Sequence, residues 1–120
     1  MELHDESQDL ITLADLIPVQ LSDPIAVRLR MSGEFRLLWA VLEDAIECYL
    51  RYVDHPSTAM RELFQEAKVW IEAKEGDDLC SFTGICGAFQ IDPDYLRRGL
   101  RRRLQGIREQ HALVSLKRAA

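Results

Sequence analysis

The sequence predicts an all-α protein: a helical hairpin packed on a small C-terminal unit of further helices. Apolar residues recur at spacings of three and four over residues 34–53 and 58–74, which is the period of an amphipathic helix. Turn-forming residues separate these stretches from each other and from residues 79–120. A chain of 120 residues, of which 48% are hydrophobic, can bury one core, so we expect one compact domain.

Residues 1–33 are expected to form an N-terminal arm with a short helix over 9–17. Apolar residues cluster over 10–21 in an acidic setting, and Pro18 and Pro24 interrupt any longer helix. The arm either packs on its own domain or docks on a partner or a second subunit. A protein contact through 10–21 is therefore one interpretation of this segment.

The hairpin is expected over residues 34–78. Its two helices cover 34–53 and 58–74, and each has one apolar face and one charged face. Because the loop between them is short, they should pack as an antiparallel pair. Trp39 and Trp70 are large enough to anchor the interface between the two helices.

The most specific pattern begins at Ser81, which can cap a short helix. The apolar residues of that helix lie on one face and are Phe82, Ile85, Cys86 and Phe89. The chain must then turn over 90–92. Asp92 can cap a second helix with Pro93 at its first position, where a missing N–H is tolerated. The buried face of this second helix is formed by Leu96, Leu100 and Leu104.

Residues 81–104 resemble the helix-turn-helix superfamily of bacterial DNA-binding proteins. In the first helix, the resemblance rests on a polar and an apolar residue at its start, Ser81-Phe82, and on an apolar residue followed by a small one, Ile85-Cys86. It also rests on the buried turn residue Ile91 and on Asp92-Pro93-Asp94 at the start of the second helix. It implies that residues 79–120 form a helix-turn-helix unit with a basic C-terminal helix or tail. Its second helix would be a recognition helix that enters the major groove of DNA.

Gln90 departs from the superfamily pattern, which has glycine at this position of the turn. A left-handed conformation is unfavourable by about 1 kcal/mol for residues other than glycine, so a wider turn is expected. Gly84, Gly87 and Gly99 lower the helix propensity of the segment but allow close helix contacts.

Positive charge is concentrated at the C-terminal end, although the net charge of the chain is −5. Residues 95–120 hold eight basic residues against one acidic residue, whereas residues 1–94 hold seven basic and 19 acidic residues. A polyanion meets this local field rather than the net charge. The distribution therefore favours nucleic-acid binding at the C-terminal end.

The predicted function is sequence-specific binding of double-stranded DNA by a small transcriptional regulator, for which a homodimer is one expected form. Its candidate contact residues are Asp94, Tyr95, Arg97, Arg98, Arg101, Arg102, Arg103 and Arg108. Tyr95, Arg97, Arg98 and Arg101 are expected near bases or adjacent phosphates, because arginine can pair with two acceptors of guanine. Arg102, Arg103 and Arg108 are expected to contact backbone phosphates.

A second interpretation is a helix-turn-helix-like protein-interaction module that docks on transcription or replication machinery.

The sequence does not favour other classes of protein. The spacing of Cys80 and Cys86 does not suit zinc and the histidines are scattered, so neither a metal nor another cofactor is expected. No motif assembles a nucleophile with a base, so an enzyme is not expected. With no membrane-length apolar run and no basic leader, we expect a cytoplasmic protein without membrane contact.

Overall fold

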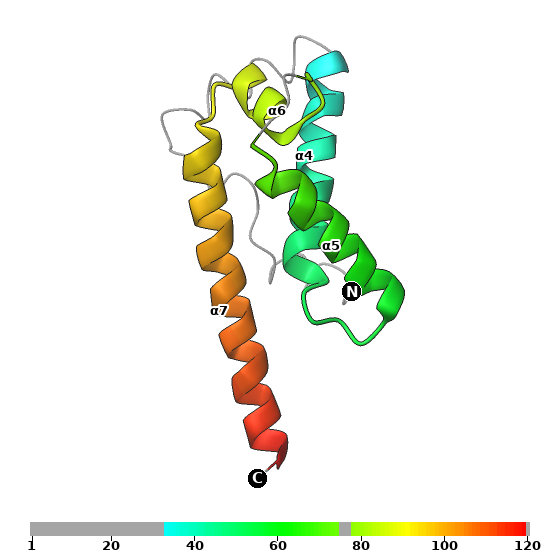
Figure 1. The fold of residues 1–120 in the computed structure, drawn as a ribbon, viewed down its shortest axis with the longest axis vertical. Helices are drawn as coiled ribbons and strands as arrows, with labels where there is room; N and C mark the ends of the chain where they lie inside the picture. The colour runs from blue at the N-terminus through cyan, green and yellow to red at the C-terminus, as the bar shows by residue number, and fades with distance from the viewer. Residues whose placement is uncertain (1–32, 75–77, 120) are drawn as a thin grey trace, which may run out of the picture.

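The computed structural model describes residues 33–74 and 78–119, which form four α-helices and no strand and are 81% helical (Figure 1). The prediction of an all-α protein is confirmed. Apart from Gly33, the predicted N-terminal arm lies outside the described residues.

Helices α4 (Gly33–Arg51) and α5 (Thr58–Glu72) run in opposite directions and pack against each other (Figure 1). The rings of Tyr49 and Phe64 stack across their interface with centroids 5.6 Å apart. Ser57 stands at the N-cap of α5, but its side chain makes no capping hydrogen bond.

The two tryptophans lie elsewhere than the sequence suggested. Trp39 packs edge-on against Phe89, with ring centroids 5.0 Å apart, and Trp70 packs against Phe82 at 5.7 Å. The indole N–H of Trp70 also donates to the carbonyl oxygen of Cys80 at 3.2 Å. Both side chains therefore contact residues 80–89 rather than each other. Helical spacing shows which residues share a face, but it does not identify the element packed on that face.

Helix α6 (Phe82–Ala88) begins and ends with complete backbone caps. Ser81 Oγ accepts a hydrogen bond from the N–H of Gly84 at 3.0 Å. At the other end, the N–H of Ile91 donates to the carbonyl of Cys86 at 2.8 Å, and that of Gln90 to the carbonyl of Gly87 at 3.1 Å. These two bonds form a Schellman motif, which satisfies the last carbonyls of a helix.

The turn after α6 is tighter than expected. Gln90 adopts the left-handed conformation, with φ of 60°, that the position requires and that glycine adopts without strain. The buried side chain of Ile91 packs in the core, as predicted. Burial of this side chain and the two hydrogen bonds of the motif offset the strain at Gln90, so the turn forms without glycine.

Helix α7 (Pro93–Ala119) begins at the predicted cap, where the N–H of Asp94 donates to Oδ1 of Asp92 at 3.1 Å. It continues unbroken for 27 residues. Its C-terminal end extends beyond the other helices (Figure 1). All residues of α7 from Arg108 to Ala119 are exposed.

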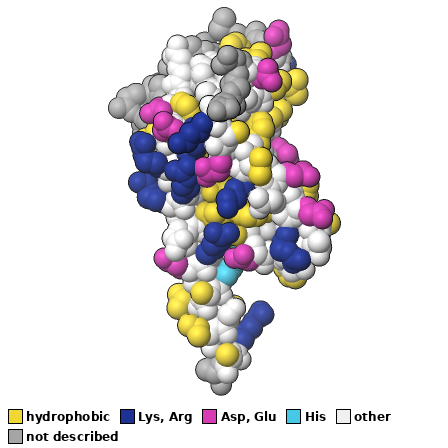
Figure 2. Space-filling model, in the orientation of Figure 1, with side chains coloured by type: hydrophobic (Ala, Val, Ile, Leu, Met, Phe, Trp, Pro, Cys, Tyr) yellow, Lys and Arg dark blue, Asp and Glu magenta, His cyan; other side chains and the backbone are white. Residues whose placement is uncertain are grey.

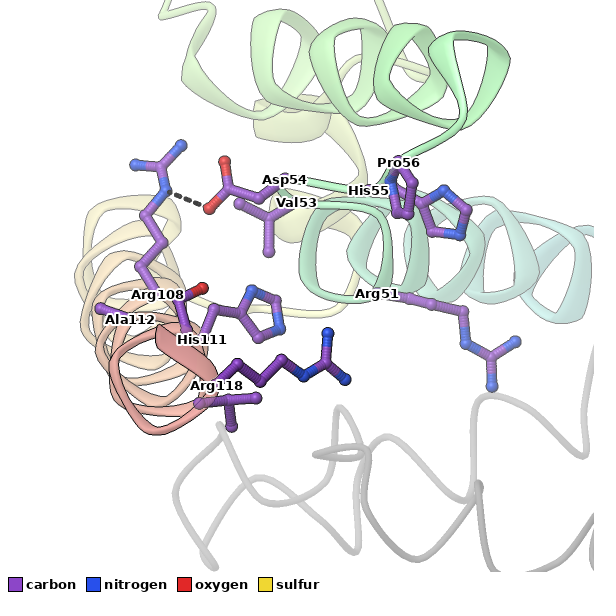
Figure 3. Close-up of a pocket in the computed structure, with 11 residues that line it drawn as sticks. Arg51, Val53, Asp54, His55, Pro56, Arg108, His111, Ala112 and Arg118 are labelled. Carbon is purple, nitrogen blue, oxygen red and sulfur yellow. Dashed lines mark ion pairs between the residues drawn. The ribbon is translucent and has the colours of Figure 1, made fainter. Parts of the chain in front are cut away.

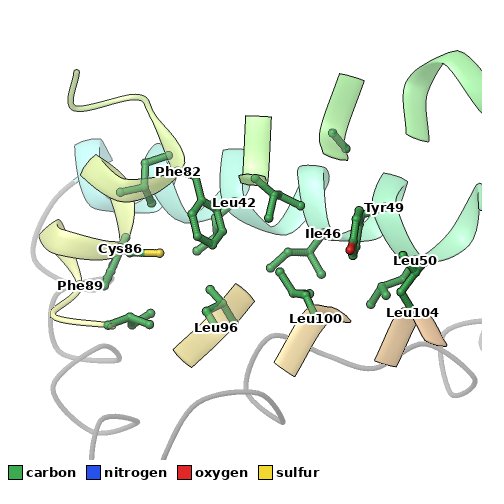
Figure 4. Packing of buried hydrophobic residues seen from close by; sticks show 14 of the residues in the cluster. Leu42, Ile46, Tyr49, Leu50, Phe82, Cys86, Phe89, Leu96, Leu100 and Leu104 are labelled. Carbon is green, nitrogen blue, oxygen red and sulfur yellow. The ribbon is translucent and has the colours of Figure 1, made fainter. Parts of the chain in front are cut away.

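All four helices contribute to one hydrophobic core (Figure 4). It includes the predicted buried residues of α6 and α7 and the apolar face of α4. Prominent members are Leu42, Ile46, Tyr49, Leu50, Phe82, Cys86, Phe89, Leu96, Leu100 and Leu104. This core fixes the side of α7 that faces inward, and thereby the side that faces solvent.

Burial of the thiols gives a direct test of this packing. Burial raises the pKa of Cys86 to about 12, whereas Cys80 is exposed. Because the thiolate is the reactive form, iodoacetamide at about pH 8 should label Cys80 in the native protein and Cys86 only after unfolding. Mass spectrometry of peptides over a time course measures both rates. Similar rates for the two cysteines in the native protein would contradict the burial of α6.

Candidate nucleic-acid interface

A cationic stripe runs along the solvent side of the first half of α7. We define it as Tyr95, Arg98, Arg102 and Arg103, all of which are exposed. Tyr95, Arg98 and Arg102 are spaced by three and four residues, which places them on one face of the helix. Lys and Arg side chains gather beside this part of α7 in the space-filling view (Figure 2).

The three arginines of the cationic stripe have no carboxylate partner among the described residues. Ion pairs there join Arg97, Arg101 and Arg108 to carboxylates, but none involves Arg98, Arg102 or Arg103. Their guanidinium groups therefore remain available to an external anion. Arginine presents several N–H donors in a fixed geometry that matches phosphate oxygens.

Arg97 does not belong to this stripe, contrary to the sequence-based placement. Its side chain is only 3% exposed. Its Nε donates to the carbonyl oxygen of Ile71 at 2.7 Å, and its Nη2 donates to that of Ala73 at 2.9 Å. These carbonyls lie at the C-terminal end of α5, where a helix leaves such groups without partners. Arg97 thus caps α5 from α7.

The same guanidinium group also ties α6 and the start of α7 to this point. Nη2 donates to the hydroxyl of Thr83 at 3.0 Å, and Nη1 donates to the Asp94 carboxylate at 3.0 Å. The guanidinium carbon lies 4.9 Å from the centroid of the Phe82 ring, a cation–π distance. Arg97 is therefore a structural clamp between three helices.

A sequence signal for this burial exists. Arg97 precedes Leu100 by three residues and Leu104 by seven, which puts it on the edge of the buried face. The residue type predicted an exposed side chain instead, since arginine is almost never fully buried unless it is paired. Its partners are mainly backbone carbonyls of α5, which side-chain patterns do not reveal.

Arg101 is engaged by the protein itself. Its Nε and Nη2 donate to the two carboxylate oxygens of Glu72 at 3.1 and 2.6 Å. The hydrogen bonds from Arg101 lower the pKa of Glu72 and hold it ionised. Because half of the Arg101 side chain is exposed, solvent screens this pair and its contribution to stability is small. Arg101 lies beside the cationic stripe, but its charge is largely compensated.

Arg108 and Asp94 each have an ionic partner within the protein, so neither belongs to the cationic stripe. Arg108 faces the Asp54 carboxylate, with its Nε 3.8 Å from Oδ2, and lies over the Phe64 ring at 5.8 Å. The Asp94 side chain is 64% exposed and binds Arg97, and its negative charge repels phosphate. Of the eight sequence candidates, only four form the cationic stripe.

Two adjoining hollows on α4 and α5, which share Glu66 and Trp70, form an acid-rimmed apolar groove that sequence analysis did not identify. Four large hydrophobic side chains are exposed on these helices, with Leu37 at 65% and Val69 at 60% the most exposed. The groove walls also hold carboxylates. Its lining includes Val41, Asp44, Cys48, Glu62, Leu63, Glu66, Val69 and Trp70. The signal was visible in the sequence as apolar residues next to acidic ones, but such residues are assigned to a core by default.

Within residues 33–74 and 78–119, no three His, Cys, Asp or Glu side chains lie close enough together to bind a metal ion. No helix in these ranges is long and apolar enough to cross a membrane. Comparison of the chain with protein-family models, with curated proteins and with solved structures finds no match.

Proposed function

We propose that this protein binds double-stranded DNA through α6 and α7, which act as a helix-turn-helix unit in a small transcriptional regulator. The observation that carries the proposal is the cationic stripe. Its arginines project from the helix that follows a tight turn, and none has a carboxylate partner within the described part of the chain. The α4–α5 hairpin packs behind this unit and holds it.

Local geometry supports this assignment of α6 and α7. In a helix-turn-helix unit, a buried residue of the turn fixes the second helix against the first, and Ile91 occupies this place. The N-terminal part of a recognition helix faces the base edges. Tyr95 and Arg98 then lie nearest the bases, while Arg102 and Arg103 lie further along and contact backbone phosphates.

A homodimer extends this proposal. One helix contacts few base pairs, and two copies on adjacent half-sites would double the contact. The acidic remainder of the chain, which holds most of the 20 acidic residues, would limit non-specific binding.

Salt dependence of binding tests the DNA proposal. The logarithm of the affinity for duplex DNA should fall with the logarithm of salt concentration, with a slope of about −0.9 for each phosphate neutralised. The double variant Arg98→Ala/Arg102→Ala should bind about tenfold more weakly at ~50 mM salt, and its slope should be smaller by up to about two. Fluorescence anisotropy with a labelled duplex measures both quantities.

The matched control is Arg36→Ala/Lys74→Ala, which removes the same charge from exposed positions on α4 and after α5. It should retain the affinity and the slope of the unmodified protein. Equal losses in the two double variants would show that net charge alone governs binding. No binding of the unmodified protein at ~50 mM salt would refute the proposal.

The acid-rimmed groove favours a second candidate function, a protein-interaction module. Its exposed apolar side chains and rim of Asp44, Glu62 and Glu66 match a helical segment that is apolar on one face and basic at its edges. Capture of such a basic amphipathic peptide, abolished by Val69→Glu, would support this function. The arm segment 10–21, the other predicted docking element, lies outside the described residues.

A further inference from the structure

A pocket of about 570 Å³ lies between the C-terminal half of α7 and the end of α4 with its following loop (Figure 3). Its size is within the range typical of small-molecule sites. Among the described residues that line it are three arginines, Arg51, Arg108 and Arg118, one carboxylate, Asp54, and the imidazoles of His55 and His111.

Two of these side chains extend from α7 across the gap. His111 and Arg118 follow Leu104 at spacings of seven, so they continue the inward-facing side of α7 beyond the core. Figure 3 shows both side chains pointing toward the end of α4 that carries Arg51. The inward face of α7 thus changes from apolar, where it meets the core, to polar, where it meets the pocket.

The loop side of the pocket is held in place. His55 accepts a hydrogen bond at Nδ1 from the N–H of Ser57 at 3.0 Å, and its ring packs edge-on against Tyr52 at 5.7 Å. These contacts leave Nε2 of His55 as the ring atom that can donate outward. Val53, Pro56 and Val114 form the apolar part of the wall.

Among the described lining residues of the pocket, three arginines outnumber one carboxylate. Asp54 is the carboxylate among the described lining residues, and it faces Arg108 at 3.8 Å. Arg51 pairs with Glu47 at 3.1 Å, on its own helix. Neither carboxylate pairs with Arg118. Guanidinium groups around one hollow raise its electrostatic potential and favour an anion there.

We propose that this pocket binds the phosphate group of a small phosphorylated compound. The guanidinium fork of Arg118 matches phosphate oxygens, and His111 and the hydroxyl of Ser115 line the same wall as additional donors. The uncharged part of the compound contacts Val53, Pro56 and Val114. The pocket is therefore a ligand site for an organic phosphate.

This site is separate from the cationic stripe. His111 follows Arg102 by nine residues, which is two and a half turns of helix, so the two side chains lie on opposite sides of α7. A DNA duplex on the stripe cannot also fill the pocket. The inference does not depend on the proposed DNA binding.

Isothermal titration calorimetry with inorganic pyrophosphate and with adenosine monophosphate tests the site in the full chain. Both should bind, and Arg118→Ala and His111→Ala should each weaken binding about tenfold, because each removes a donor to a charged group. Lys117→Ala is the matched control: it removes a neighbouring cation that does not line the pocket, and should leave binding unchanged.

Three results would overturn the site. One is no heat of binding for either probe. The second is equal binding by the variants and the control, which would place the anion elsewhere. The third is displacement of the bound probe by duplex DNA, which would make the pocket part of a nucleic-acid surface. Arg98→Ala/Arg102→Ala should bind both probes normally, so loss of DNA binding and loss of ligand binding can be told apart.

Discussion

Replacement of Arg97 by methionine is expected to lower the free energy of unfolding by about 3 kcal/mol. Methionine fills much of the same volume, but it donates no hydrogen bond. The carbonyl of Ile71 and the hydroxyl of Thr83 then lose their partner, and α5 loses its connection to α7. Hydrogen bonds from a charged donor each contribute about 1.5–3 kcal/mol, and several are lost together.

Urea denaturation followed by tryptophan fluorescence measures this effect. Arg98→Met is the matched control, because Arg98 is the adjacent arginine and is exposed. Its effect on stability should stay within about 0.5 kcal/mol. Arg97→Lys keeps the charge but cannot reach all of the acceptors, so an intermediate loss is expected. Equal stability of Arg97→Met and Arg98→Met would show that Arg97 does not clamp the three helices.

Gly84→Ala is expected to destabilise the protein by about 1–3 kcal/mol, the usual range for overpacking. A Cβ at this position would lie 2.1 Å from the carbonyl oxygen of Asp78, which is backbone. That oxygen also accepts hydrogen bonds from the N–H and the hydroxyl of Ser81, at 3.0 and 2.7 Å. Any shift that relieves the clash therefore disturbs the cap at the start of α6.

Gly87→Ala provides the comparison within the same short helix. A Cβ there meets no atom within 4 Å, so the substitution should stabilise the protein by up to ~1 kcal/mol through helix propensity. Thermal unfolding followed by circular dichroism should rank the proteins as Gly87→Ala, unmodified and Gly84→Ala. Reversal of this order would contradict the close approach of residue 78 to α6.

Local sequence signals predicted the four helices, the caps of α6 and α7 and the apolar residues that these two helices bury. Capping by Ser81 and Asp92 and burial of Ile91 depend on neighbours only a few positions away, so single-sequence rules capture them. The left-handed turn at Gln90 was harder, because its strain is offset by tertiary burial of the next residue.

Contacts between distant segments could not be predicted in this way. Arg97 is buried because it meets carbonyls 26 and 24 positions earlier in the chain, and Arg101 is neutralised by a carboxylate 29 positions earlier. The sequence-based interpretation grouped Arg97 and Arg101 with the exposed Arg98, because their partners lie in a distant segment. The pocket between α7 and the α4–α5 loop likewise depends on the length and direction of α7, which no local pattern fixes.

The most direct test of the central claim is to map the DNA contact on the protein itself. Amide signals of the ¹⁵N-labelled chain should be recorded during titration with a random duplex at ~50 mM salt. We expect progressive shifts at Tyr95, Arg98, Arg102 and Arg103, and unchanged signals at Val41 and Val69 in the acid-rimmed groove. Shifts confined to the groove or to the α7 pocket, or no shifts at all, would contradict DNA binding by the cationic stripe.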